Sequence, residues 1–492
     1  VYRRGVQVVQ KVGRRLIGLM LSATLAFYVP LSAAELRLPE MGSAAGAVWT
    51  PTQQDRIGQG VLRSLRSAGK LHTDPLLGEY IAALGARLVS AAEVLDQRFH
   101  FFVVDDDSIN AFAAPGGYIG VHTGLILAAR NEGELAAVLA HEIAHVTQEH
   151  LARASDEAGS MSIPPLVALL GAMLVGAADP QLGSAAVAGV AAGSAQRQIN
   201  FTRYHEQEAD RIGIQILASA GFDPNDMPQF FERMQQASRY SGSQLPTFLR
   251  THPVTTNRLA EAKDRASRLA PRQIPLALDF HLVQARIAAV AMADPREARE
   301  RLSESRRNSQ GVLRTAAEYG LVMVALREKQ FAEARRMAST LVRTNPDRLA
   351  FRILSAEVES ADGQWSEALR IYDEAQKLFP GNHPLTIRYA ETLLQTQQAR
   401  EARLLLQAHL RNRVPEPEVY RLAAKASGEA GFAAEAHSYL AESFYLLGHF
   451  GEALRQIELA FKQPELDRYL ESRLVARKRT IEEEMRLSKA DE

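Results

Sequence analysis

The chain has 492 residues, enough for two to four domains with large buried cores. Lysine plus arginine and aspartate plus glutamate both total 57, so the net charge is zero and no basic field favours a nucleic-acid partner. There is no cysteine, which excludes disulfides, thiolate metal sites and cysteine nucleophiles. Any metal would therefore be bound by histidine and carboxylate side chains.

The first 34 residues have the layout of a secretory signal peptide. Basic residues without any acid occupy residues 1–15, an apolar run follows over 16–29, and small residues at 32 and 34 suit cleavage before Glu35. An uncleaved membrane anchor is the alternative, although the run is shorter than the roughly 20 residues of a spanning helix. Both readings predict export, and a large chain without cysteine fits a bacterial periplasm.

The next segments predict a small sheet followed by helices. A polar segment around Pro51–Asp55 precedes residues 74–91, whose apolar periodicity predicts an amphipathic helix. Residues 98–104 and 118–122 are rich in β-formers and predict two strands, with a proline–glycine turn between them. Asn131 is a suitable N-cap for a helix that runs toward Leu151.

That helix carries the sequence His141-Glu142-Ile143-Ala144-His145, an HExxH motif. Four residues advance about 400° around a helix, so both imidazoles project from one face and can bind one Zn²⁺. Glu142 is then placed to accept a proton from water and to pass it to a leaving amine. Two solvated or core histidines without a metal are the alternative.

A third ligand has to come from another segment, and a second predicted helix, over residues 200–220, offers several. Glu206 and Asp210 are four residues apart and face the same way, whereas Glu208 is about 200° from Glu206 and points oppositely. We therefore predict Glu206 as the ligand and Asp210 as the acceptor that orients a ligand histidine. The alternatives are His205 or Glu208 as ligand, or pairing of these acids with Arg203 or Arg211 on a solvated face.

The longer zinc-binding layout HExxHxxGxxH is not met. Gln148 stands where glycine belongs, and Leu151 stands where the third histidine belongs. His150 misses that register by one residue, so we assign it to the helix surface.

Residues 163–195 are almost purely apolar and small. Asp179-Pro180-Gln181 divides them into runs that are each short for a membrane-spanning helix. We interpret the segment as a loop or hairpin near the site, with a membrane contact as the alternative.

The second half contains an internal repeat. Glu-Ala pairs occur at 333/334, 367/368, 401/402 and 435/436, each 34 residues after the last. This is the period of the tetratricopeptide repeat, in which helical hairpins stack through small residues at fixed positions. The pattern predicts a solenoid over roughly 310–482, with helical material over 275–307 as its cap.

Three features together resemble the gluzincin metalloproteases that include the prenyl-protein CAAX protease and the heat-shock membrane zincin HtpX. They are HExxH at 141–145, Glu-x-x-x-Asp at 206–210, and Thr251-His252-Pro253 followed by Arg258-Leu259. The resemblance implies one Zn²⁺ bound by His141, His145 and Glu206, with Glu142 as general base. It also implies that His252 can close over the zinc as a regulatory fourth ligand.

The signal peptide and the repeats make the chain most similar to periplasmic members of this family. The resemblance implies an α+β zincin (gluzincin) protease domain with a small sheet, followed by an all-α tetratricopeptide-repeat solenoid. We expect a signal peptide over 1–34, the zinc metalloprotease domain over 35–270, a helical linker or cap over 271–309 and the repeat domain over 310–492.

The resemblance further implies a periplasmic zinc-dependent endopeptidase with a chaperone-like role in protein quality control. Such an enzyme promotes assembly of outer-membrane β-barrel proteins and degrades misassembled ones. Unfolded or stalled barrel proteins would be its clients, the repeats would contact the barrel-assembly machinery, and peripheral membrane association is compatible with this role. The alternative is a non-proteolytic chaperone or scaffold that acts through the repeats.

Two expectations concern substrate binding. An extended peptide would add to the strand predicted at 118–122, because an exposed strand edge offers backbone groups to a peptide. The sequence does not identify the hydrogen-bond donor that stabilises the developing oxyanion. The chemically suitable side chains are those of Arg203, Tyr204, Arg211 and Arg258.

Overall fold

A computed structural model describes residues 49–94, 97–157, 195–240, 246–272, 275–411 and 416–490. The predicted signal peptide and all but the last residue of the apolar segment 163–195 lie outside the described residues. In the part of the chain that the structure describes, no helix is both long enough and apolar enough to span a membrane.

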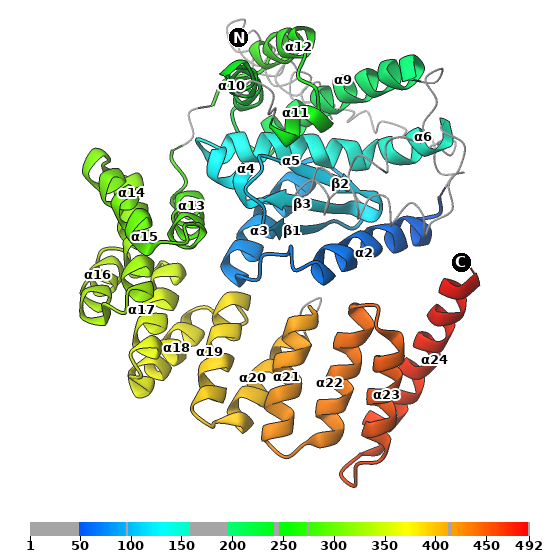
Figure 1. Cartoon of the computed structure of the whole chain (residues 1–492), viewed down its shortest axis with the longest axis vertical. Coiled ribbons are helices and arrows are strands. Elements are labelled where there is room, and N and C mark those ends of the chain that lie inside the picture. Colours follow the sequence, from blue (N-terminus) through cyan, green and yellow to red (C-terminus); the bar gives the residue numbers. More distant parts are fainter. Residues whose placement is uncertain are drawn as a thin grey trace, which may run out of the picture. The chain divides into compact units, whose positions relative to one another are not determined.

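A three-stranded sheet lies at the centre of the N-terminal half (Figure 1). Its strands are β1 (His100–Val104), β2 (Ala111–Ala114) and β3 (Tyr118–His122), in the order β1-β3-β2. β3 pairs in parallel with β1 and antiparallel with β2. The two predicted strands are confirmed, but the sequence reasoning missed β2, because Ala-Phe-Ala-Ala lacks the β-branched residues that mark a strand.

The sheet order corrects the expectation about substrate pairing. β3 is the central strand and both of its edges are occupied, so residues 118–122 are unable to accept a substrate strand. The outer edge of β1 is partly covered as well, since Leu71 forms a bridge with Val104 and the His72 amide donates to the Val103 carbonyl. Among the described residues, β2 is therefore the edge strand whose outer side pairs with no other strand.

Helices cover both faces of the sheet. α2 (Pro51–Ser67) places Val61 and Leu65 against Val104 and Tyr118 on one face. α3 (Pro75–Ala91) and α5 (Glu132–Thr147) pack against the alternate residues of the strands, as expected from the two-residue side-chain period of a strand. The helix predicted at 74–91 is confirmed. The polar segment around Pro51–Asp55 forms the start of α2, which Thr50 caps.

α5 follows the short helix α4 (Thr123–Ala128) and begins after the predicted N-cap Asn131, whose side chain accepts from the Glu134 amide. It does not continue to Leu151. The helix ends at Thr147, Glu149 adopts a left-handed conformation with φ of 51°, and a separate helix, α6 (His150–Glu157), starts after it. This break decides where His150 lies.

Four helices lie beyond α5 on the side away from the sheet (Figure 1). They are α9 (Ala195–Ser219), α10 (Asp226–Tyr240), α11 (Thr247–Thr251) and α12 (Thr256–Ser267). α9 confirms the helix predicted over 200–220. α9 crosses α5 closely at Gly213, where a Cβ would lie only 3.2 Å from the backbone of His141. Glycine, which has no Cβ, permits this close approach.

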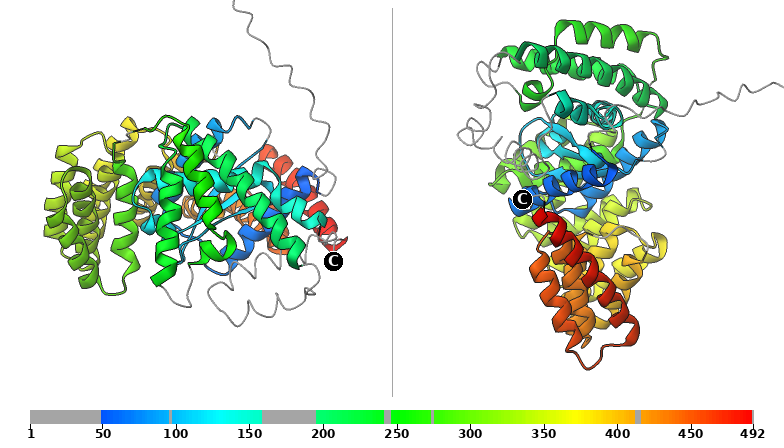
Figure 2. Two further views of the ribbon diagram at one scale, coloured as in Figure 1. Left: turned by 90° about the horizontal axis from the view of Figure 1, so that it is seen from above. Right: turned by 90° about the vertical axis from the view of Figure 1, so that its right-hand side faces the viewer.

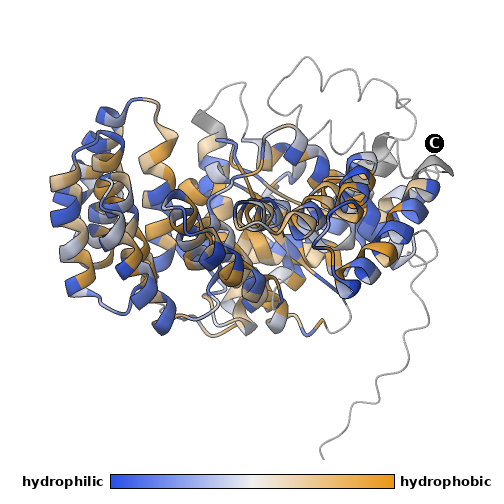
Figure 3. Cartoon of the chain, turned by 90° about the horizontal axis from the view of Figure 1, so that it is seen from below, coloured by the Kyte–Doolittle hydropathy of each residue, from blue (hydrophilic) through white to orange (hydrophobic). Residues whose placement is uncertain are grey.

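The C-terminal half consists of helices that pack as antiparallel hairpins (Figure 2). Ala334, Ala368, Ala402 and Ala436, the small residues of the 34-residue repeat, are all buried between helices. Figure 3 shows apolar and polar stretches alternating along these helices, as stacked amphipathic hairpins require. The helices are α13 (Leu278–Ala291), α14 (Pro295–Asn308), α15 (Gly311–Arg327), α16 (Phe331–Thr344), α17 (Leu349–Ala361), α18 (Trp365–Leu378), α19 (His383–Gln395), α20 (Ala399–Leu410), α21 (Pro417–Glu429), α22 (Ala433–Leu446), α23 (Phe450–Phe461) and α24 (Arg468–Ala490).

A buried arginine links the helices before and within the repeats to the N-terminal half. Arg286 on α13 forms an ion pair with Asp74, the N-cap of α3. The same guanidinium donates to the Tyr319 hydroxyl at 2.9 Å and lies 3.3 Å from the Glu357 carboxylate on α17. Since a buried charge requires partners, these contacts hold α13 to the N-terminal end of α3 and to α15 and α17.

Candidate metal centre

The two histidines of the HExxH motif lie on one face of α5. Their Nε2 atoms are 3.0 Å apart, and His141 is almost completely buried. α5 itself is buried along most of its length, so packing fixes the backbone that carries both rings. The helical geometry expected from the four-residue spacing is therefore present.

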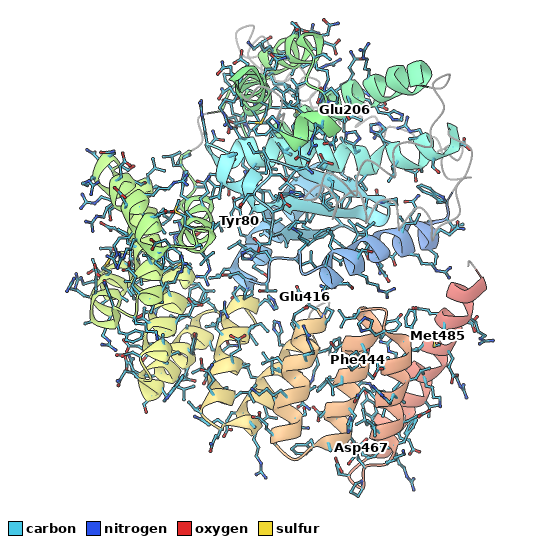
Figure 4. All side chains as sticks on the ribbon, in the orientation of Figure 1. Tyr80, Glu206, Glu416, Phe444, Asp467 and Met485 are labelled. Atoms are coloured by element: carbon cyan, nitrogen blue, oxygen red, sulfur yellow. The ribbon has the colours of Figure 1, made fainter. Side chains whose placement is uncertain are left out.

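Glu206, which is labelled in Figure 4, reaches the same point from α9. Its two carboxylate oxygens lie 3.4 Å from the Nε2 atoms of His141 and His145, respectively. Asp210, one turn further along α9, places a carboxylate oxygen 3.0 Å from Nδ1 of His141. Glu208 points away from this cluster and pairs with His150, and His205 stacks on the His150 ring.

Arg258 on α12 holds both carboxylates. It donates two hydrogen bonds of 2.7 Å to Asp210, lies 2.8 Å from Glu206 and is 3% exposed. Arg258 thus directs one carboxylate at His141 and the other at the point between the two motif histidines. Because its donors are already engaged, Arg258 is unsuited to the oxyanion role that its chemistry suggested.

His252 completes the cluster from the C-terminal end of α11. Its Nδ1 atom lies 3.0 Å from Glu206 and 3.4 Å from Nε2 of His141, and its Nε2 atom lies 3.5 Å from Glu142. The ligand atoms of His141, His145, Glu206 and His252 all lie within 4.8 Å of one another. The structure thus brings together all four residues predicted to bind metal, from three separate helices.

The donor set fits a divalent cation of the zinc class. Nitrogen lone pairs and a carboxylate converge on one point, where a cation offsets their mutual repulsion. The second ring nitrogen of His141 lies beside Asp210, and that of His145 lies 2.8 Å from Nδ1 of His150. Such partners leave the Nε2 lone pairs directed at the shared point.

The electrostatics of the cluster favour an ionised Glu206. Burial acts to raise the pKa of this carboxyl, but His252 and the hydrogen bonds of the two motif histidines outweigh it and hold the pKa well below its usual value. Burial likewise opposes ionisation of Asp210, and Arg258 reverses this, so that the pKa of Asp210 is also lowered. Both carboxylates are therefore ionised at neutral pH.

Glu142 projects beside the cluster and is almost fully buried. Burial raises the pKa of its carboxyl, which is the direction expected of a group that exchanges protons near neutral pH. The backbone amide of Ala113 on β2 lies near enough to the same carboxyl to act on it in the opposite direction and lower the pKa. The edge strand and the predicted general base are thus neighbours.

The sequence-based assignment of His150 is wrong. His150 is not on the helix surface but 4% exposed and in contact with His145. The helix break at Glu149 causes the difference, since a continuous helix would have separated positions 145 and 150 by about 140°. Of the remaining oxyanion candidates, Arg203 and Tyr204 are exposed and Arg211 pairs with Glu208 at 3.5 Å.

Two contributions escaped the sequence reasoning. These are the support that Arg258 gives to both carboxylates and the position of Ala113 beside Glu142. The arginine follows His252 closely in sequence, and this local pattern is the only sequence signal for its place; Ala113 carries none.

Comparison with known proteins agrees with both halves of the chain. Residues 75–266 match the model of peptidase family M48, and residues 360–426 match a tetratricopeptide-repeat model. The first match contains all the residues of the cluster. The second lies within the stacked helices.

Full-length relatives are also found. The chain is 38% identical to the putative beta-barrel assembly-enhancing protease of Vibrio cholerae, over 90% of this chain and 91% of that protein. It is 35% identical to the beta-barrel assembly-enhancing protease of Escherichia coli K12, over 89% of this chain and 90% of the relative. A more distant similarity, 30% identity over 38% of this chain and 52% of the relative, links it to the mitochondrial metalloendopeptidase OMA1 of Schizosaccharomyces pombe.

Proposed function

Since this chain belongs to the β-barrel assembly-enhancing proteases, a family of M48 metalloendopeptidases, we propose that it is a zinc-dependent endopeptidase of the periplasm. Its ligands would be His141, His145 and Glu206. Glu142 would act as general base, and Asp210 would orient His141.

One observation carries this proposal. The side chains of His141, His145 and Glu206 converge from α5 and α9 with a buried carboxylate, Glu142, beside them. A structural zinc site has no need of a buried carboxylate beyond its ligands, whereas a base adjacent to the metal is the arrangement of a hydrolytic site. The non-proteolytic scaffold is thus not favoured, and membership in a metalloendopeptidase family argues against it too.

The residues would divide the work of peptide hydrolysis. Zinc, when bound, supplies a Lewis acid that polarises the scissile carbonyl and acidifies water. The Glu142 carboxylate would accept a proton from that water and deliver it to the departing amine, which needs a pKa near the working pH. Arg258 and Asp210 keep Glu206 and His141 in place during these steps.

The edge of β2 offers a place for the substrate. An extended peptide that pairs with this strand would pass beside Glu142, because the Ala113 amide lies near enough to that carboxyl to affect its pKa. Unassembled β-barrel proteins expose alternating apolar strands with unpaired edges, which suit pairing with an edge strand. Barrel assembly is part of the names of the full-length relatives, and this agrees with such clients.

His252 would hold the enzyme latent. It contacts Glu206 and His141 and approaches Glu142, so in this arrangement it occupies the space where water and substrate have to act. We assign it the role of a regulatory fourth ligand that withdraws on activation. The short helix α11, which it ends, is the element that would move.

The repeats would provide the contact with partners. Stacked hairpins present an extended surface for proteins, and we propose the barrel-assembly machinery as the partner and outer-membrane barrel precursors as the clients. In this role the chain would both assist assembly and degrade stalled barrels, as a chaperone-like protease of quality control.

The metal content of the purified mature protein tests the proposal, together with cleavage of an unfolded outer-membrane barrel protein. We expect about one zinc per chain, lost in His141→Ala and in Glu206→Ala. Cleavage of the unfolded barrel but not of its folded form should accompany zinc. A purified protein that binds no zinc, or whose zinc survives both substitutions, would contradict the assignment.

A further inference from the structure

His150 lies between the proposed ligand His145 and a carboxylate. Its Nδ1 atom is 2.8 Å from Nδ1 of His145, and its Nε2 atom is 3.1 Å from the Glu208 carboxylate. The rings of His145 and His150 meet nearly edge to face, at an interplanar angle of 78°. Both nitrogens of His150 are thus directed at polar groups, which is more than packing alone requires.

The proton positions along the hydrogen-bonded series His145–His150–Glu208 follow from the carboxylate at its end. An ionised Glu208 only accepts, so Nε2 of His150 donates to it and Nδ1 of His150 is left to accept. Nδ1 of His145 then carries a hydrogen and donates to His150. His145 is thereby held in the tautomer whose Nε2 lone pair faces His141 and Glu206.

Neighbouring side chains hold the series His145–His150–Glu208 in place. His205 stacks on His150 with ring centroids 4.2 Å apart and an interplanar angle of 11°. Arg153 and Arg211 hold Glu208, at 3.3 and 3.5 Å. Arg153 also donates to the Gln148 carbonyl at 2.7 Å, so the same side chain fixes the helix break that turns His150 back toward the site.

The two motif histidines are therefore supported differently. His141 faces a carboxylate directly, whereas His145 faces a histidine that in turn faces a carboxylate. A ligand histidine gains orientation and basicity from an acceptor at its second nitrogen, and loss of such an acceptor typically lowers metal affinity about 10- to 100-fold.

We propose that His150 and Glu208 are positioning residues that act in series to orient His145 for zinc. This inference rests on the proposed zinc site. It assigns roles to one residue that the sequence placed on the surface and to another that the sequence offered as a ligand.

Competition for Zn²⁺ between the full-length protein and a fluorescent chelator tests this. His150→Phe keeps an aromatic ring and removes both nitrogens, and Glu208→Gln removes the charge that sets the direction of the hydrogen bonds. Each should weaken zinc affinity about 10- to 100-fold while one zinc still binds at saturation. Glu261→Gln, on the exposed face of α12, should leave the affinity unchanged.

The double variant identifies action in series. If Glu208 works through His150, adding Glu208→Gln to His150→Phe should cause little further loss of affinity. The thermal midpoint of the metal-free protein should change little in these variants. A purely structural role of His150 and Glu208 would give the reverse result, a lower thermal midpoint with unchanged zinc affinity. If His150→Phe fails to fold, the more exposed Glu208 still decides the question.

The outcomes separate the two proposals. A wild-type chain without stoichiometric zinc overturns both. Stoichiometric zinc in the wild type with unchanged affinity in His150→Phe and Glu208→Gln overturns the positioning role and leaves the zinc site standing. Equal and additive losses would also contradict action in series.

Discussion

Nε2 of His252 lies 3.5 Å from the carboxylate of Glu142, so the residue proposed to block the site faces the residue proposed to work in it. Both come to this contact from different elements, α11 and α5, and both are largely buried. Their roles are opposite, and substitution of each therefore has an opposite expected effect on proteolysis.

Replacement of Glu142 by glutamine should abolish proteolysis and leave the zinc in place. The amide retains the shape of the side chain but is unable to accept a proton, and general-base catalysis contributes about 10²- to 10⁴-fold. The rate of cleavage of an unfolded barrel protein and the zinc content check this, with Glu261→Gln as control. Wild-type cleavage rates in Glu142→Gln would remove the general-base assignment.

Replacement of His252 by alanine should raise proteolysis several-fold. The side chain that contacts Glu206 and approaches Glu142 is then gone, while three proposed ligands remain. Initial rates on the same substrate check this at equal zinc content. A loss of activity with zinc retained would indicate a positive catalytic role for His252 instead of a latent one.

Removal of the metal should lower the thermal midpoint of the protein. A ligand that binds only the folded chain stabilises it by about 2.7 kcal/mol when its free concentration is 100 times the dissociation constant. Differential scanning fluorimetry with and without a chelator measures the shift. The His141→Ala variant should melt at the same temperature in both conditions, and an equal shift in that variant would show that the chelator acts elsewhere.

Replacement of Arg286 by methionine should destabilise the chain strongly. The change leaves Asp74 without its buried ion-pair partner and leaves Glu357 with Arg388 alone, at 3.1 Å. Loss of one partner of a buried ion pair typically costs about 3–5 kcal/mol. Urea unfolding measures it. Arg299→Met, which disrupts partly exposed ion pairs with Glu328 and Glu333, is the matched control and should cost less than about 1 kcal/mol.

Stability should also depend on pH through Asp226. Burial, with the nearby charges of Asp223 and Glu134, raises the pKa of its carboxyl to about 6 in spite of the hydrogen bond from Asn131. The folded chain then binds this proton more tightly than the unfolded chain, so the free energy of unfolding falls as pH rises from about 4 to about 6, by about 1–3 kcal/mol.

Asp226→Asn tests this directly. Asparagine can accept the same hydrogen bond but has no proton to lose, so the variant should lack this part of the pH dependence and be more stable than wild type at pH 7. Urea unfolding at several pH values provides the comparison. Parallel curves for the two proteins across that range would show that Asp226 does not titrate as described.

The sequence by itself determined those features that depend on a fixed spacing of residues, either within one helix or from one repeat to the next. The HExxH spacing puts His141 and His145 on one face, and Glu206 and Asp210 share a face of α9 for the same reason. The 34-residue interval predicted the stacked hairpins, because the small residues it carries have to be buried at each contact.

Only the tertiary structure decided which elements meet. The left-handed turn at Glu149 brings His150 back to His145, which no helical period predicts. The short strand β2 forms the edge of the sheet beside Glu142, and β3 lies in the centre although it has the stronger strand pattern. His252 reaches His141 from 111 residues away. Contacts of this kind depend on chain reversals and on packing between distant elements, for which local periodicity carries no signal.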